Sequence, residues 1–113
     1  MHEAAIAQGV LDIALNEAQR HAAQRINKVK VRIGEFRGVV KEALEFAFEA
    51  LKQNTPAAEA VLEVETVRLQ LECATCGAVA CEISDFSLLC PQCDGVVQII
   101  AGREMQVEYV DID

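Results

Sequence analysis

The hydrophobic and polar positions along the chain predict two helices separated by a strand. From Ala4 to about Arg25, apolar residues recur at three- and four-residue steps, which is the spacing of an amphipathic helix. The same spacing returns from about Val39 to Gln53, and Pro56 ends that segment. Each helix therefore has one apolar face to bury against another layer.

Period-two alternation predicts the strands. Residues 26–33 alternate apolar side chains with Lys28, Lys30 and Arg32, as expected for a half-buried strand that ends at the Gly34–Gly38 turn. We expect this basic face to be solvated, and a patch for an acidic partner is the alternative. Further strands are predicted over 62–66, over 96–100 and at Met105, Val107 and Tyr109.

The alternation changes parity near Thr66 and Val67, after which the apolar set is Val67, Leu69 and Leu71. A one-residue slip turns side chains to the opposite face, so a bulge or a hinge is expected there. The predicted fold is α+β: a small three-stranded sheet with two helices on one face, and an inserted four-cysteine zinc ribbon. The two units are expected to span 1–67 with 103–113, and 68–102. Strand order is not fixed by the pattern.

Two cysteine pairs lie within the inserted unit. Cys73 and Cys76 form one pair, Cys90 and Cys93 form the other, and two residues separate the members of each. This spacing lets four thiolates surround one tetrahedral ion, and such a closed site is normally structural. Zinc is the expected metal. A rubredoxin-like iron site, two disulfides or unligated buried cysteines are the alternatives. Cys81 lies outside the pattern, and we expect it to be a small buried hydrophobic residue.

Composition and charge narrow the classes of function that the protein can have. The formal net charge of -8 opposes binding to nucleic acid and to anionic membranes. We find neither a signal-peptide pattern nor an apolar run that could cross a membrane, so a cytoplasmic protein with reduced thiols is expected. No phosphate loop or catalytic triad pattern appears, and we predict that the protein is not an enzyme.

The first three residues form a second candidate metal site. Met1, His2 and Glu3 offer an α-amine, an imidazole and backbone nitrogens within one short stretch. Nitrogen donors suit nickel(II) or copper(II). A frayed chain start is the alternative interpretation, because termini are often disordered.

Over its full length the chain resembles the HypA/HybF family of hydrogenase nickel-incorporation proteins. The resemblance rests on Met1-His2-Glu3, on the strand and turn of 28–36, on 39–48, and on both cysteine pairs. The family resemblance implies transient nickel binding by His2 and its neighbours Met1 and Glu3. It implies structural zinc bound by four cysteines: Cys73, Cys76, Cys90 and Cys93.

By the same resemblance, the protein is expected to be a metallochaperone that inserts nickel into the large subunit of a [NiFe] hydrogenase. A HypB-type GTPase is the expected partner, and urease maturation proteins are further candidates. The Ala22-Ala23 stretch departs from the family in lacking a glycine where the first helix ends. The alternative functions are a zinc-ribbon interaction or nucleic-acid-binding module without nickel, and a rubredoxin-like electron carrier.

Overall fold

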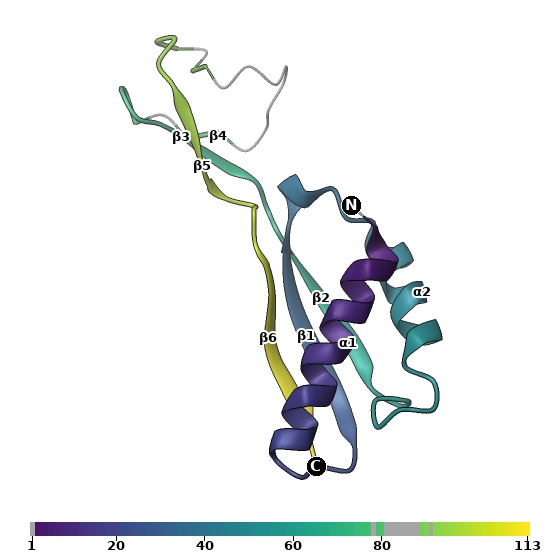
Figure 1. Cartoon of the computed structure of the whole chain (residues 1–113). Helices are drawn as coiled ribbons and strands as arrows, with labels where there is room; N and C mark the ends of the chain where they lie inside the picture. Colours follow the sequence, from purple (N-terminus) through teal and green to yellow (C-terminus); the bar gives the residue numbers. More distant parts are fainter. Residues whose placement is uncertain (1, 78, 81–88, 91) are drawn as a thin grey trace.

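The computed structural model describes residues 2–77, 79–80, 89–90 and 92–113, and it confirms the predicted α+β class (Figure 1). Cys81 lies outside the described residues. The elements in chain order are α1 (Glu3–Arg20), β1 (Ile26–Gly34), the 3-10 helix η1 (Glu35–Arg37), α2 (Lys41–Leu51), β2 (Val61–Val67), β3 (Gln70–Cys73), β4 (Val79–Ala80), β5 (Val97–Ala101) and β6 (Met105–Ile112).

Two separate sheets organise the described chain. The main sheet has the order β2-β1-β6, with β1 parallel to β2 and antiparallel to β6. Both helices cover one face of this sheet (Figure 1). The second sheet has the order β4-β3-β5 and is entirely antiparallel. Since β6 returns to pair with β1, the cysteine-bearing segment is an insertion, as predicted.

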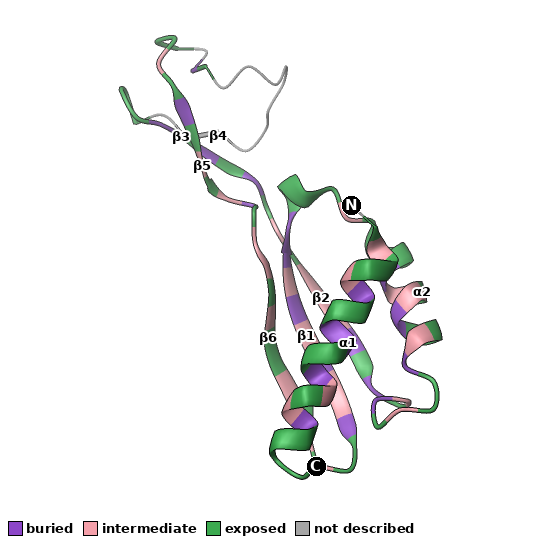
Figure 2. Ribbon diagram, viewed as in Figure 1, coloured by how far each residue is buried: buried purple, intermediate pink, exposed green. Residues whose placement is uncertain are grey.

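The larger core lies between the main sheet and the two helices. The central strand β1 supplies Val29, Val31 and Ile33, which pack against residues of α1 and α2 such as Leu11 and Phe48. Figure 2 shows these buried positions along β1 and on the sheet-facing sides of the helices. The second sheet has its own small cluster of buried residues: Leu69, Leu71, Cys73, Cys90 and Val97.

The opposite face of the main sheet is charged and partly exposed. Its basic residues come from β1, and its acidic partners come from both neighbouring strands. Lys30 contacts Glu65 of β2 at 3.2 Å and Glu108 of β6 at 3.3 Å, and Arg32 contacts Glu65 at 3.0 Å. The basic residues of β1 therefore form a solvated, ion-paired face within the protein's own sheet.

A register shift in β6 divides the strand. Val107 pairs with Val31, whereas Tyr109 pairs with Lys30, so Glu108 is the extra residue of a bulge. As a result, Met105 and Val107 before the bulge, and Val110 and Ile112 after it, pack toward the helices. Tyr109 is exposed, and its ring lies 5.9 Å from the Lys28 Nζ.

The first helix ends at Arg20, earlier than the predicted end near Arg25. Ala22 takes a left-handed conformation, with a φ of 52°. The Ala23 N–H donates to the Ala18 carbonyl at 2.8 Å, and the Ala22 N–H donates to Gln19 at 3.1 Å. These two bonds form a Schellman cap, in which glycine usually holds the left-handed position. The end of α1 therefore has the usual cap hydrogen bonds, although Ala22 occupies the left-handed position that glycine usually holds.

Of the bulge or hinge predicted near Thr66 and Val67, the structure has a passage between sheets, because β2 ends at Val67 and β3 begins at Gln70 in the other sheet. The turn after β1 is hydrogen-bonded to the segment that connects β2 to β3. The Glu35 carboxylate accepts from the Leu69 N–H at 3.1 Å, and the Phe36 N–H donates to the Gly102 carbonyl at 2.9 Å. A side chain at Gly34 would overlap the Gly102 backbone. Two segments connect the sheets, one between β2 and β3 and the other between β5 and β6. Both are thus attached to the turn after β1.

Within the part of the chain that the structure describes, we find no helix that is both long and apolar enough to cross a membrane.

Candidate metal sites

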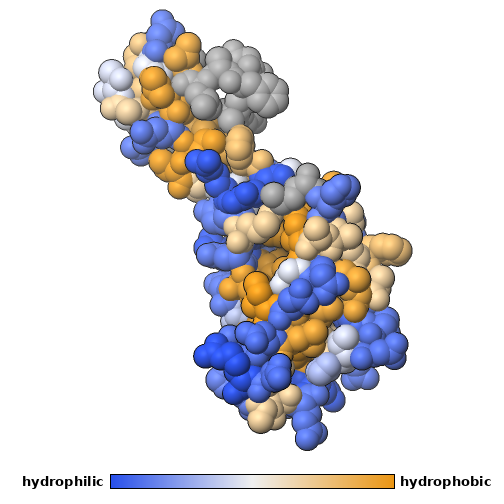
Figure 3. Space-filling model, in the orientation of Figure 1, coloured by the Kyte–Doolittle hydropathy of each residue, from blue (hydrophilic) through white to orange (hydrophobic). Residues whose placement is uncertain are grey.

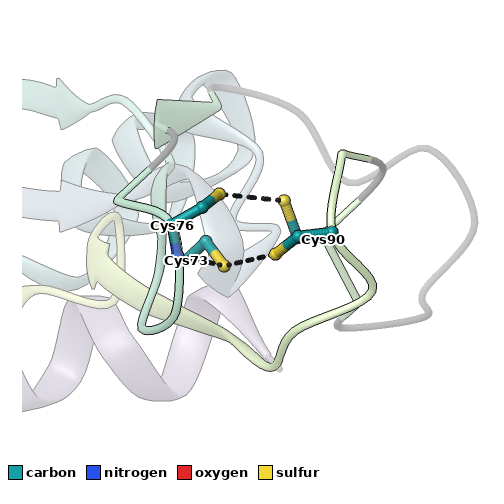
Figure 4. A group of neighbouring side chains, drawn as sticks. Cys73, Cys76 and Cys90 are labelled. Carbon is teal, nitrogen blue, oxygen red and sulfur yellow. Dashed lines mark hydrogen bonds between the residues drawn. The ribbon is translucent and has the colours of Figure 1, made fainter.

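Four cysteine side chains converge at the far end of the second sheet. Cys73 ends β3 and Cys76 follows it, while Cys90 and Cys93 precede β5. Figure 4 shows sulfur atoms from the two loops facing one another across a small gap. The Cys73 and Cys93 Sγ atoms lie 3.4 Å apart, the Cys76 and Cys90 Sγ atoms lie 3.7 Å apart, and all four lie within 4.8 Å of one another.

These separations fit a tetrahedral ion. A metal–sulfur distance of about 2.3 Å implies sulfur atoms about 3.8 Å apart at the corners of a tetrahedron. A disulfide requires about 2.05 Å, and the four cysteines are free thiols. The close contacts also join the two pairs to each other, as a shared ion would require. The predicted four-cysteine metal site is therefore assembled by the fold, and its residues fit a structural zinc ion.

The two cysteine loops have matching backbone turns. In the first, the Gly77 N–H donates to the Cys73 carbonyl at 2.9 Å, and in the second the Asp94 N–H donates to the Cys90 carbonyl at 2.8 Å. Both residues are left-handed, with φ of 77° at Gly77 and 57° at Asp94. Aspartate tolerates this region better than most residues. Asp94 therefore holds the position in the second turn that glycine holds in the first.

Backbone N–H groups prepare one thiol for metal binding. The N–H groups of Cys76 and Thr75 both lie 3.4 Å from the Cys73 Sγ, and they lower the pKa of that thiol to about 6. The Gly95 N–H favours the Cys93 thiolate, but the neighbouring Cys73 thiol, burial and the other cysteines raise the Cys93 pKa to about 12. Thiols this close together resist being ionised at the same time, because the negative charges of the thiolates repel one another. A cation at their centre would relieve this repulsion.

The second candidate site lies at the chain start. Met1 lies outside the described residues. His2 is exposed and stands immediately before α1, where its carbonyl accepts from the N–H groups of Ala5 at 3.1 Å and Ile6 at 3.2 Å. The first N–H groups of a helix have no partner within it. The His2 imidazole and the first backbone nitrogens are therefore not used by the hydrogen bonds that form the helix.

Glu3 has a specific position that the sequence did not indicate. Its carboxylate accepts from the Val40 N–H at 2.9 Å, across 37 residues of sequence. Val40 is the N-cap of α2 and has no capping side chain of its own. The Val40 N–H, followed by the Glu3 N–H, lowers the pKa of the Glu3 carboxyl. The contact joins the start of α1 to the start of α2, at the end of the main sheet nearest the inserted unit (Figure 1).

Comparison with known proteins covers nearly the whole chain. Residues 1–112 match a family described as hydrogenase/urease nickel incorporation, metallochaperone, hypA. A hydrogenase maturation factor HypA of Caldanaerobacter subterraneus is 36% identical over 115 residues, covering 100% of both chains. Another, of Aquifex aeolicus, is 34% identical over 114 residues and covers 100% of this chain and 98% of its own.

Two solved structures have a similar fold over nearly the whole chain. The solution structure of the Ni metallochaperone HypA from Helicobacter pylori superposes with a TM-score of 0.68 at 25% identity, covering 99% of this chain and 97% of that one. A second solution structure, of a HypA protein, has a TM-score of 0.73 at 25% identity and covers 100% and 97%.

Proposed function

Because the chain belongs to the HypA family of hydrogenase and urease nickel-incorporation metallochaperones, we propose that it binds Ni(II) at its N-terminus and delivers it to a [NiFe] hydrogenase large subunit. A HypB-type GTPase is the proposed partner in delivery, and urease maturation proteins are further candidates. The protein acts by carrying an ion in the cytoplasm and not by catalysing a reaction. Family membership favours this function over a nucleic-acid-binding zinc ribbon.

His2 is the proposed principal side-chain ligand, and the Met1 amine and nearby backbone nitrogens are its co-ligands. The exposure of His2 supports this assignment, because a delivered ion must remain accessible to an acceptor. Nickel(II) suits nitrogen donors of this kind. A terminal site is also easier to empty than a closed core site.

Glu3 is the proposed support of the nickel site. Its hydrogen bond to the Val40 N–H is the observation that carries the proposal, because the bond ties the start of α1 to a second helix. A carboxylate at a helix N-terminus is also favoured by the helix dipole. We propose that Glu3 positions the neighbouring His2 and does not need to bind nickel itself.

The four cysteines are the proposed structural zinc ligands: Cys73, Cys76, Cys90 and Cys93. The ion would link the two cysteine pairs and so stabilise a unit whose hydrophobic core is small. We further propose that the nickel-binding unit spans 1–67 with 103–113 and that the zinc-binding unit spans 68–102. The separate sheets and cores support these limits.

Extending the N-terminus tests this proposal. An added glycine-serine segment before Met1 replaces the terminal amine with an amide and leaves His2 unchanged. We expect the extended protein to lose high-affinity nickel binding in a calorimetric titration, while its zinc content and circular dichroism match those of the native chain. Equal nickel affinity in both proteins would contradict the proposed terminal site.

A further inference from the structure

The outer face of α2 carries apolar side chains that do not enter the core. Phe46 is 78% exposed, whereas Leu44 and Phe48, two residues before and after it, are fully buried. Val40, the N-cap of the helix, is 54% exposed. Figure 3 shows apolar atoms on the surface over α2. A single exposed apolar residue needs no explanation, but several along one helix indicate a contact surface.

The spacing of these apolar residues is that of a contact between two helices. Ala43 lies three residues before Phe46 and Ala50 lies four residues after it, so the three side chains are neighbours on one side of the helix. Both alanines are exposed. Apolar residues at positions i, i+3 and i+7 are the pattern by which one helix packs against another. The two small side chains let a partner helix approach closely beside the Phe46 ring.

One flank of this apolar stripe carries an acidic group that the protein does not neutralise within its described part. Glu42 lies four residues before Phe46 and is exposed. Among the described residues, no lysine, arginine or histidine lies within ion-pair distance of its carboxylate. Glu49, on the same flank, is by contrast paired with Lys52 at 2.8 Å. A basic side chain that approaches Phe46 from this flank therefore meets a carboxylate that is available for pairing.

The stripe begins next to the proposed nickel site. The Val40 N–H donates to the Glu3 carboxylate at 2.9 Å, and Glu3 follows His2. A protein that exchanges nickel with the chain start must come close to His2. Val40 is therefore both the first residue of the apolar stripe and a support of the proposed nickel site.

We propose that the outer face of α2, defined by Val40, Ala43, Phe46 and Ala50 with Glu42 at its flank, binds a helix of the protein that exchanges nickel with this chain. The partner helix has an apolar face against the Phe46 ring and a lysine or arginine that pairs with Glu42. The inference rests on the proposed nickel delivery. A second copy of this chain fits less well, because the net charge of -8 opposes self-association and antiparallel pairing of two α2 helices would bring their acidic flanks to the same side.

The test uses the full zinc-loaded chain and a synthetic peptide of two heptads, with leucine on one helix face and lysine on both sides of that face. The control peptide contains the same residues in an order that spreads leucine around the helix, so it has equal charge. We expect the first peptide to shift the backbone NMR signals of α2 saturably, with weaker affinity at high salt. The control peptide should bind at least about tenfold more weakly.

Four variants localise the binding. Phe46→Ala should weaken the first peptide about tenfold, because it removes the central aromatic side chain of the surface. Val61→Ala is its matched control, since Val61 is 60% exposed on β2. Glu42→Gln should weaken binding and reduce its salt dependence, whereas Glu59→Gln, at another exposed position, should change neither. Circular dichroism and zinc content should be unchanged in all four variants.

A calorimetric nickel titration separates this inference from the proposed function. Phe46→Ala should bind nickel like the native chain, because its side chain lies outside the proposed ligands. A native chain that binds nickel but not the first peptide would overturn the docking surface alone. A native chain that binds the first peptide but not nickel would contradict the terminal nickel site and support the docking surface.

Three results would overturn the proposal: no binding up to about 1 mM of the first peptide, equal binding of the two peptides, or a loss of binding in Val61→Ala as large as that in Phe46→Ala. Sedimentation of the free protein as a dimer that Phe46→Ala dissociates would also overturn it, because the occupant would then be a second copy.

Discussion

The carboxylate of Glu3 and the backbone N–H of Val40 are joined by a 2.9 Å hydrogen bond that connects the first turn of α1 to the N-terminus of α2. The bond lowers the pKa of the Glu3 carboxyl. Val40 cannot cap α2 with its own side chain, and the acidic group that stands there comes from the residue next to His2. The proposed nickel site is therefore attached to the packing of the two helices.

Substitutions of Glu3 distinguish a residue that supports the nickel site from one that binds nickel directly. Glu3→Ala removes the acceptor of the Val40 N–H and should lower nickel affinity about tenfold, as loss of a residue that orients a ligand does. In Glu3→Gln the amide oxygen can still accept this hydrogen bond, so most of the affinity should remain. Calorimetric nickel titrations measure both. If Glu3→Gln loses as much affinity as Glu3→Ala, the carboxylate is a ligand and the supporting role is wrong.

The ion-paired face of the main sheet predicts a specific response to acid. Lys30 and then Arg32 lower the pKa of the Glu65 carboxyl below its ordinary value of 4.5. The contribution of Glu65 to stability is therefore complete above pH 4.5 and is lost as the pH falls through the lowered folded-state pKa. Glu65→Gln should reduce the free energy of unfolding at neutral pH, and its difference from the native chain should shrink in acid.

Urea denaturation followed by circular dichroism at a series of pH values measures this difference. Glu59→Gln is the control, since Glu59 is exposed and makes no ion pair among the described residues. All three proteins keep the same cysteines, so release of zinc in acid affects them equally. A constant difference between Glu65→Gln and the native chain across the acidic range would contradict the assignment.

Much of this fold could be predicted from local patterns, because burial imposes a period on the sequence. The alternation of Val29, Val31 and Ile33 predicted β1 and its core face. The parity change near Val67 predicted the passage from one sheet to the other. The cysteine spacing predicted the metal site, because two intervening residues give two thiols a common direction.

Contacts between distant segments could not be predicted in this way. Nothing near Glu3 in the sequence indicates Val40 as its partner, and nothing near Glu35 indicates Leu69. The bulge at Glu108 was also missed, because Met105, Val107 and Tyr109 read as one regular alternation. The end of α1 was placed too late because Ala22, a good helix former, adopts the left-handed cap.

Removal of zinc should affect the two units differently. The second sheet buries only a small cluster and depends on the proposed ion, whereas the main sheet and helices share the larger core. Chelation should therefore abolish the NMR dispersion of residues in β3 and β5 while helical circular dichroism is retained. Cys90→Ser should behave like the chelated protein, and Cys81→Ser should retain zinc because Cys81 lies outside the two pairs. Loss of all structure together would show that the units do not fold independently.

The most direct test of the nickel chaperone proposal is a calorimetric nickel titration of the untagged, zinc-loaded protein beside its His2→Ala variant, with zinc assayed before and after. We predict that the native chain binds nickel, that the variant does not, and that zinc remains bound in both, because the two ions occupy separate sites. Equal nickel binding by both proteins, or displacement of zinc by nickel, would contradict the proposed terminal site.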